Sequence, residues 1–107
     1  NNSKNLDSKS VANPAQESAA EKIKVSNIYP NPANDYAYLD YTVNGNFNSA
    51  NVSFFNLLGK QVAEYPLGKY SEKLKINTSS WESGIYMYQL IIDGKKVATK
   101  KLLVRHN

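Results

Sequence analysis

Hydrophobic and polar residues alternate along most of the chain after residue 22, and this alternation predicts β-strands. It is strictest over residues 36–43, where apolar side chains occupy every second position. Because successive side chains of a strand point to opposite faces, we expect one face of this segment to be buried. The residues expected on that face are Ala37, Leu39, Tyr41 and Val43.

Further strands follow from the same pattern elsewhere in the chain. The longest covers residues 85–92, which are rich in aromatic and β-branched side chains. Shorter runs predict strands at residues 23–29, 51–55, 61–65, 73–77 and 96–104. Residues 78–82 are expected to form a single helical turn, in which Trp81 closes one end of a core.

Proline, glycine and asparagine mark the connections between these strands. Pro30 and Pro32, with Asn31 between them, exclude a helix and predict a rigid turn. Asp93-Gly94 is the strongest hairpin signal in the chain. The glycines expected in turns or at strand ends are Gly59, Gly68, Gly84 and Gly94. This spacing predicts an all-β fold, an immunoglobulin-like β-sandwich of about seven antiparallel strands, with a small open barrel as the competing architecture.

The first 22 residues differ in composition from the rest of the chain. Leu6 and Val11 are their only larger apolar side chains, among Asn, Ser, Lys, Ala, Gln and Glu. Such a segment cannot bury enough apolar surface to offset the entropy lost on ordering it. We therefore expect a flexible linker at residues 1–22 and a β-sandwich domain at residues 23–107.

The formal net charge of +4 lies in the expected sandwich, because residues 1–22 balance three lysines against three acidic residues. Cations gather after Asp93 in the sequence, at Lys95, Lys96, Lys100, Lys101 and Arg105. Basic residues among aromatic ones also occur in proteins that bind single-stranded nucleic acid. Here the aromatic residues fall on strand positions, and lysines on edge strands prevent aggregation without any partner. We expect no nucleic-acid partner, and sugar binding by Tyr36 and Tyr38 is an equally weak interpretation.

Residue types that carry catalysis are scarce. His106 is the single histidine, and as the penultimate residue it is expected to be solvated rather than held in a catalytic relay. The absence of cysteine excludes disulfides and thiol chemistry. The acidic residues of the expected sandwich occur singly, and no insertion provides the cleft that a carboxylate pair would need. We expect neither enzyme activity nor a metal or cofactor.

Targeting segments are also missing from the chain. No apolar stretch approaches the roughly 20 residues that a membrane-spanning helix needs, so no membrane insertion is expected. The chain begins at Asn1 rather than Met and does not open with a signal peptide. If the protein is exported, we expect this sequence to be the C-terminal piece of something longer.

The last eight residues, 100–107, form an apolar run flanked by cations at the end of the chain. Termini fray unless a strand holds them, so catalytic residues seldom lie there. Packing of an apolar strand does not require flanking cations, which leaves these charges free to be recognised by a partner. The predicted recognition residues are Lys100, Lys101, Leu102, Leu103, Val104, Arg105 and His106.

Four motifs follow one another in the sequence and together resemble the type A C-terminal sorting domain of the type IX secretion system. They are Tyr29-Pro30-Asn31-Pro32-Ala33, residues 52–62 (VSFFNLLGKQV), Ser83-Gly84-Ile85-Tyr86 and Lys101-Leu102-Leu103-Val104. The resemblance covers roughly residues 28–106, and the order and spacing make it specific. The residues that we expect to specify the fold are Pro30, Asn31, Pro32, Gly59, Gly84, Tyr86 and Gly94.

The resemblance implies a function for the whole chain. Such domains lie behind a fused cargo and direct it, from the periplasm, through an outer-membrane translocon to the cell surface or the medium. A sortase-like surface peptidase then usually removes the domain, and residues 1–22 would offer an accessible cleavage region. The hairpin of residues 85–106 would present an exposed edge strand suited to β-augmentation.

A second function class remains open from sequence alone, namely an immunoglobulin-like cell-surface module that binds sugar or protein through its loops. The two classes differ at the C-terminus. Deleting residues 101–107 should abolish export if the domain is a sorting signal, and should only destabilise a strand if it is a binding module.

Overall fold

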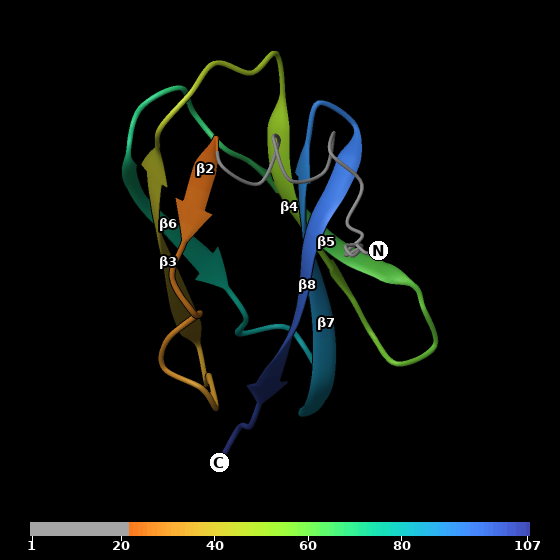
Figure 1. The fold of residues 1–107 in the computed structure, drawn as a ribbon. Coiled ribbons are helices and arrows are strands. Elements are labelled where there is room, and N and C mark those ends of the chain that lie inside the picture. Colours follow the sequence, from red (N-terminus) through yellow and green to blue (C-terminus); the bar gives the residue numbers. More distant parts are fainter. Residues whose placement is uncertain (1–21) are drawn as a thin grey trace, which may run out of the picture.

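Two antiparallel sheets face each other in the structure, a computed structural model that describes residues 22–107 (Figure 1). The smaller sheet has the order β2-β3-β6, and the larger has the order β5-β4-β7-β8. In chain order the strands are β2 (Ile23–Val25), β3 (Tyr36–Val43), β4 (Ala50–Phe55), β5 (Gln61–Pro66), β6 (Glu72–Asn77), β7 (Gly84–Ile92) and β8 (Lys95–Val104). The predicted immunoglobulin-like sandwich is confirmed, and the alternative of a barrel is wrong because the sheets stay separate.

The core lies between the two sheets, as the alternation predicts. Ala37, Leu39 and Tyr41 of β3 are buried. The ring of Phe54 on β4 is fully buried, and its centroid lies 5.5 Å from that of Tyr88. Aromatic pairs at such distances add about 0.5–1.5 kcal/mol beyond the area that they bury.

Trp81 closes one end of this core, as predicted. Its ring centroid lies 5.2 Å from that of Phe54 and 4.9 Å from that of Tyr86. The hydroxyl of Tyr86 donates a hydrogen bond to the Glu82 carbonyl at 2.6 Å, so this buried phenol has a polar partner.

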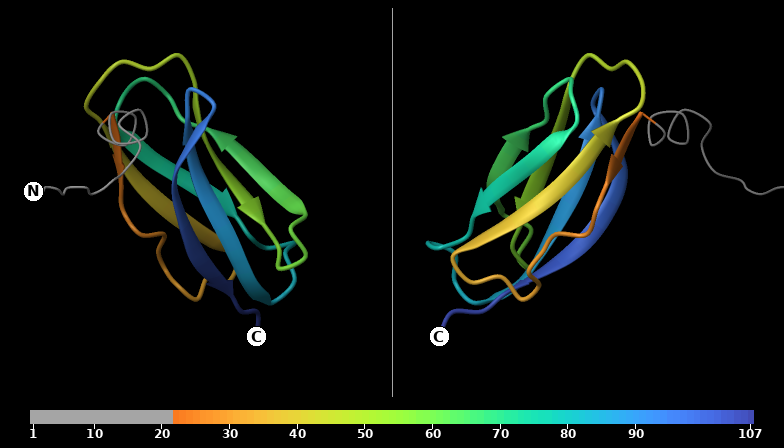
Figure 2. Two further views of the ribbon diagram at one scale, coloured as in Figure 1. Left: turned by 45° about the vertical axis from the view of Figure 1, so that its right-hand side comes forward. Right: turned by 90° about the vertical axis from the view of Figure 1, so that its left-hand side faces the viewer.

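The two ends of the sandwich carry different parts of the sequence, as the views in Figure 2 show. One end, which we call the linker end, consists of Lys22 and the connections at residues 44–49, 67–71 and 93–94. The other, which we call the motif end, consists of the connections at residues 30–35, 56–60 and 78–83 together with residues 103–107. Strand pairing fixes this division, because Gly84 lies opposite Val104 and Tyr36 lies opposite Asn77.

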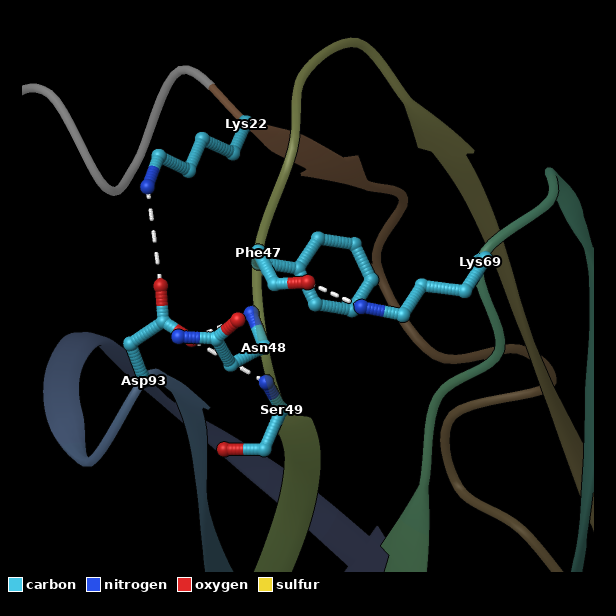
Figure 3. Close-up of polar contacts among 6 residues, drawn as sticks. All are labelled: Lys22, Phe47, Asn48, Ser49, Lys69 and Asp93. Atoms are coloured by element: carbon cyan, nitrogen blue, oxygen red, sulfur yellow. Dashed lines mark hydrogen bonds and ion pairs between the residues drawn. The ribbon is translucent and has the colours of Figure 1, made fainter.

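The carboxylate of Asp93 organises the linker end (Figure 3). Its Oδ1 accepts hydrogen bonds from the backbone N–H groups of Asn48 at 2.6 Å and Ser49 at 3.0 Å. Its Oδ2 lies 3.5 Å from the ammonium of Lys22, which immediately precedes β2. Asp93 and Gly94 both have positive φ, as a two-residue hairpin turn requires. One side chain therefore joins the β7–β8 turn, the loop before β4 and the start of the sandwich.

A second contact at the same end involves Lys69. Its ammonium donates to the Phe47 carbonyl and lies 4.3 Å from the centroid of the Phe47 ring (Figure 3). The connection between β5 and β6 is thereby held against the loop between β3 and β4.

The strand expected over residues 23–29 is shorter in the structure. Regular pairing ends at Val25. Beyond it, the Ser26 N–H still donates to the Asp40 carbonyl at 2.8 Å, and an isolated bridge joins Tyr29 to Tyr38. The cause is Ser26, whose hydroxyl accepts the backbone N–H of Asp40 at 3.0 Å, where a ladder would use a backbone carbonyl. Side chains of serine compete with the backbone in this way.

The helical turn expected over residues 78–82 is also wrong. One hydrogen bond from Trp81 N–H to the Thr78 carbonyl, 3.0 Å long, closes a turn, and no helix follows. Thr78 is instead bound to the neighbouring connection, because its buried hydroxyl donates to the Asn34 carbonyl at 2.8 Å.

The environment of Asp93 predicts a pH dependence of stability. Hydrogen bonds from the backbone of Ser49 and Asn48, with a smaller effect of Lys22, hold the pKa of Asp93 below its ordinary value. A carboxyl with a lowered pKa stabilises the fold above its unfolded pKa of about 4, and this contribution is lost as the pH falls through the folded pKa. Asp93→Asn keeps the shape but loses the charge, so it should be less stable than the wild type at pH 7 and nearly equal to it at pH 2.

Urea denaturation of the wild type and of Asp93→Asn, at pH 7 and at pH 2, measures this difference in the free energy of unfolding. Asp35→Asn is the control, since the Asp35 carboxylate makes no hydrogen bond to any residue that the structure describes. A stability difference between the wild type and Asp93→Asn that stays constant with pH would contradict the assignment.

Candidate recognition surface

The proline turn at residues 29–33 brings the chain alongside the last residues of β8. Both peptide bonds that precede its prolines are cis. The backbone N–H of Ala33 donates to the Leu103 carbonyl, and the N–H of Arg105 donates to the Ala33 carbonyl, each at 2.8 Å. The Oδ1 atom of Asn31 accepts the backbone N–H of Leu103 at 3.0 Å. We call this set of contacts between Asn31, Ala33, Leu103 and Arg105 the terminal clasp.

The terminal clasp limits how much of edge strand β8 is free to pair with another strand. As predicted, β8 forms an edge of its sheet. The outward backbone groups of Leu103 and the N–H of Arg105 are already bonded, however, so the final part of β8 cannot accept another strand without opening the clasp. The expectation that the whole terminal segment is an exposed edge is therefore wrong for residues 103–105.

The predicted recognition residues divide into two groups. Leu102 and Val104 are fully buried and belong to the core, so no partner can contact their side chains in the folded domain. Lys101 and Arg105 are exposed, and Leu103 between them is half-buried on the outer face of the sheet. Lys100 is also exposed, and its ammonium donates to Oδ1 of Asn27 at 3.0 Å.

His106 is held in the fold, which corrects the expectation of a solvated side chain. Its Nδ1 lies 2.7 Å from Oδ1 of Asn34, and its Nε2 lies 2.6 Å from the Trp81 carbonyl oxygen. A carbonyl oxygen can only accept, so Nε2 carries a proton in this contact. The backbone N–H of His106 donates to the Ser83 hydroxyl at 2.9 Å. The half-buried histidine thus joins the C-terminus to two connections of the motif end.

The connection between β4 and β5 is organised by Asn56. Its Oδ1 accepts the backbone N–H groups of Leu58 and Lys60, both at 3.0 Å. Its backbone carbonyl accepts the N–H of Gly59, whose φ of +85° suits a residue without a side chain. This loop holds Leu57 and Leu58 in solvent, with 71% and 94% of their surfaces exposed.

The sequence pattern predicts a turn here but does not predict that its two leucines are exposed. Their exposure could have been suspected, because adjacent leucines are unusual at a turn, where polar residues dominate. The other motif residues have structural roles. Pro30 and Pro32 shape the turn of the terminal clasp, Gly94 lies in the hairpin turn with φ of +80°, and Tyr86 is a core residue.

The outward tyrosines of the smaller sheet make cation–π contacts with neighbouring lysines. The ammonium of Lys75 lies 4.0 Å from the ring centroid of Tyr36, and that of Lys73 lies 5.5 Å from that of Tyr38. Cation–π contacts of this kind stabilise the sheet surface by about 0.5–1 kcal/mol each where they are exposed. These contacts account for the tyrosines and lysines of this face without a ligand.

Within residues 22–107 no three His, Asp or Glu side chains come together in a group that could hold a metal ion. Among the same residues, no helix is long and apolar enough to cross a membrane.

Comparison with known proteins identifies the family. In fold, the chain is similar to dimeric latent PorU from Porphyromonas gingivalis, with a TM-score of 0.67 and 19% identity over 79% of this chain. The match spans 9% of the PorU chain, and no curated protein matches this sequence. The sequence model of the family described as "Secretion system C-terminal sorting domain" matches residues 27–105. The chain therefore belongs to this family, whose members are the C-terminal sorting signals of the type IX secretion system and mark proteins for the cell surface or the extracellular space.

Proposed function

We propose that residues 23–107 form the recognition unit of this sorting signal and that residues 1–22 are the linker to an N-terminally fused cargo. The unit carries its cargo from the periplasm through the outer-membrane translocon. A sortase-like surface peptidase then cleaves within the linker. The unit itself catalyses no reaction, and its contribution is binding.

The observation that supports this most directly is the placement of the four sequence motifs. The turns at residues 29–33 and 56–60, the segment at 83–86 and the end of β8 all meet at the motif end. Lys22, where the linker joins, lies at the opposite end. A translocon component can therefore bind the motif end while the cargo remains on the far side of the sandwich.

The terminal clasp supports the proposal that the partner binds a folded domain rather than an unfolded tail. Backbone bonds to Ala33 and the ring contacts of His106 fix residues 103–106. Core packing of Leu102 and Val104 fixes the same strand from the inside. Lys101 and Arg105 are thereby presented at defined positions, which lowers the entropy that a partner must overcome on binding.

The structure also changes which experiment is informative. Deleting residues 101–107 removes two core side chains and the terminal clasp, so loss of export in that variant would follow from unfolding alone. Loss of large aliphatic side chains from a core typically costs about 2–5 kcal/mol each. Substitutions of exposed residues are the better probe.

The sorting function is tested with a periplasm-targeted fluorescent reporter fused to residues 1–107 in a host with the type IX machinery. We expect reporter on the cell surface or in the medium, and none there when the translocon gene is deleted. The mass of the released reporter would identify the cleaved bond. Reporter that stays folded in the periplasm of the intact host would contradict the proposal.

The role of the exposed cations is tested by replacing Lys100, Lys101 and Arg105 with glutamine in the same reporter. Exposed substitutions of this kind usually change stability by less than about 0.5 kcal/mol. We expect export to fall while the melting temperature of the purified domain stays within a few degrees of the wild type. The control replaces Lys24, Lys73 and Lys95, which lie outside the motif end, and keeps the change in net charge equal. Full export of the first variant would show that these cations are not recognised.

The terminal clasp makes a separate prediction about stability. Asn31→Ala removes the acceptor for the Leu103 N–H, and one hydrogen bond is worth about 1 kcal/mol. We expect the free energy of unfolding to fall by about that amount and the Leu103 amide to exchange faster with deuterium. Asn44→Ala, at the linker end, is the matched control. Equal exchange at Leu103 in both variants would mean that the clasp does not hold the terminus.

A further inference from the structure

The motif end displays apolar side chains that the fold does not use. Leu57 and Leu58 project from the Asn56 loop, and Ile85 at the start of β7 is 43% exposed. Burying such a side chain is worth about 1.5–3 kcal/mol, so leaving three together in water forgoes stability. The hydrogen bonds of Asn56 keep the two leucines in this exposed arrangement. Contiguous exposed apolar residues commonly mark a site of interaction.

The surface around these side chains is hollowed in two places. One hollow, of about 390 Å³, lies over the outer face of the larger sheet and is lined by Phe55, Leu57 and Met87 among others. The other, of about 230 Å³, lies at the motif end and is lined by Leu57, Leu58 and Ile85 among others. Leu57 lines both hollows, together with Asn56.

Cations border this surface along β8. Lys101 lies directly opposite Met87, and Leu103 lies directly opposite Ile85. Arg105 is exposed and follows directly after the end of β8, two residues after Leu103. Among the residues lining the two hollows, Glu82 is the one acidic group. The border is therefore mainly positive on the β8 side.

We infer that Leu57, Leu58 and Ile85, with Lys101 and Arg105 beside them, form the docking surface for a protein component of the translocon. This inference rests on the proposed sorting function. The partner surface offers apolar side chains that fill the two hollows and contact Leu57. It places acidic side chains opposite Lys101 and Arg105, because complementary charge determines register and speeds association.

A lipid surface is the alternative partner, because exposed apolar residues beside cations can also bind a membrane. The two hollows favour a protein, since side chains of a protein can fill them, whereas a lipid surface offers no fixed side chains that would do so. Glu82 at the border also disfavours contact with anionic lipid. The experiment therefore includes a membrane arm.

The variant Leu57→Asn/Leu58→Asn removes the exposed apolar side chains and leaves Asn56 and Gly59 in place. We expect export of the reporter to fall by about tenfold or more, as when a central contact of an interface is lost. The melting temperature of the purified domain should stay within a few degrees of the wild type. Tyr70→Asn is the matched control, because Tyr70 is 81% exposed at the linker end and should be dispensable for export. Should the double variant unfold, Leu58→Asn alone, at the most exposed position, replaces it.

The possible results separate the docking surface from the sorting function. If the wild-type reporter is exported through the translocon and the folded leucine variant is exported equally well, this docking surface is wrong and the sorting function stands. If the wild-type reporter is not exported, both fail. Sedimentation with vesicles of phosphatidylcholine and phosphatidylglycerol forms the membrane arm. Binding by the wild type that the leucine variant loses would assign the surface to lipid and overturn the inference.

Discussion

The pairing of Ala33 with the end of β8 is the contact on which the motif end depends. The two sheets share no strand, so side-chain packing alone joins them over most of their area. At Ala33 a backbone segment that leads into the smaller sheet bonds directly to the edge of the larger one. Asn31 adds a side-chain acceptor next to it. A flexible terminus thereby becomes a fixed part of the sandwich.

This contact explains why proline belongs in the preceding turn. The segment must leave the smaller sheet, run beside β8 for a few residues and return to begin β3. Pro30 and Pro32 restrict the backbone of the unfolded chain, which lowers the entropy lost when this path is adopted. Neither proline has an N–H, and the backbone donor that the segment uses to reach β8, the N–H of Ala33, lies outside the proline positions.

Local patterns in the sequence predict most of the strands but few of the contacts at the motif end. Alternation identifies β3 and β7 because a strand with one buried face has a period of two residues. Asp93-Gly94 identifies its hairpin because few residue pairs accept positive φ at both positions. The interruption at Ser26 escapes such reasoning, since it depends on which backbone group the hydroxyl meets across the sheet. The ring of His106 meets Asn34, 72 residues earlier, and no local pattern reports a contact at that separation.

The exposed leucines were missed for a different physical reason. Periodicity describes residues inside strands, whereas Leu57 and Leu58 lie in a connection where hydrophobicity has no structural use. Their environment becomes clear only when β4, β7 and β8 are placed side by side, because Met87 and Ile85 then lie near the loop and Lys101 lies beside Met87. The grouping of these side chains on one surface therefore depends on tertiary structure, even though Leu57, Leu58 and Ile85 belong to motifs visible in the sequence.

Strand β8 shows how folding and recognition can share one segment. Alternate side chains near its end serve different purposes, with Leu102 and Val104 in the core and Lys101 and Leu103 on the outer face. A substitution on the inner face acts through the stability of the whole domain, whereas one on the outer face changes the surface that a partner meets. The same period of two that predicts the strand thus separates the residues that maintain the fold from the residues that face solvent. Without buried neighbours in the same strand, the outward residues would have no fixed positions.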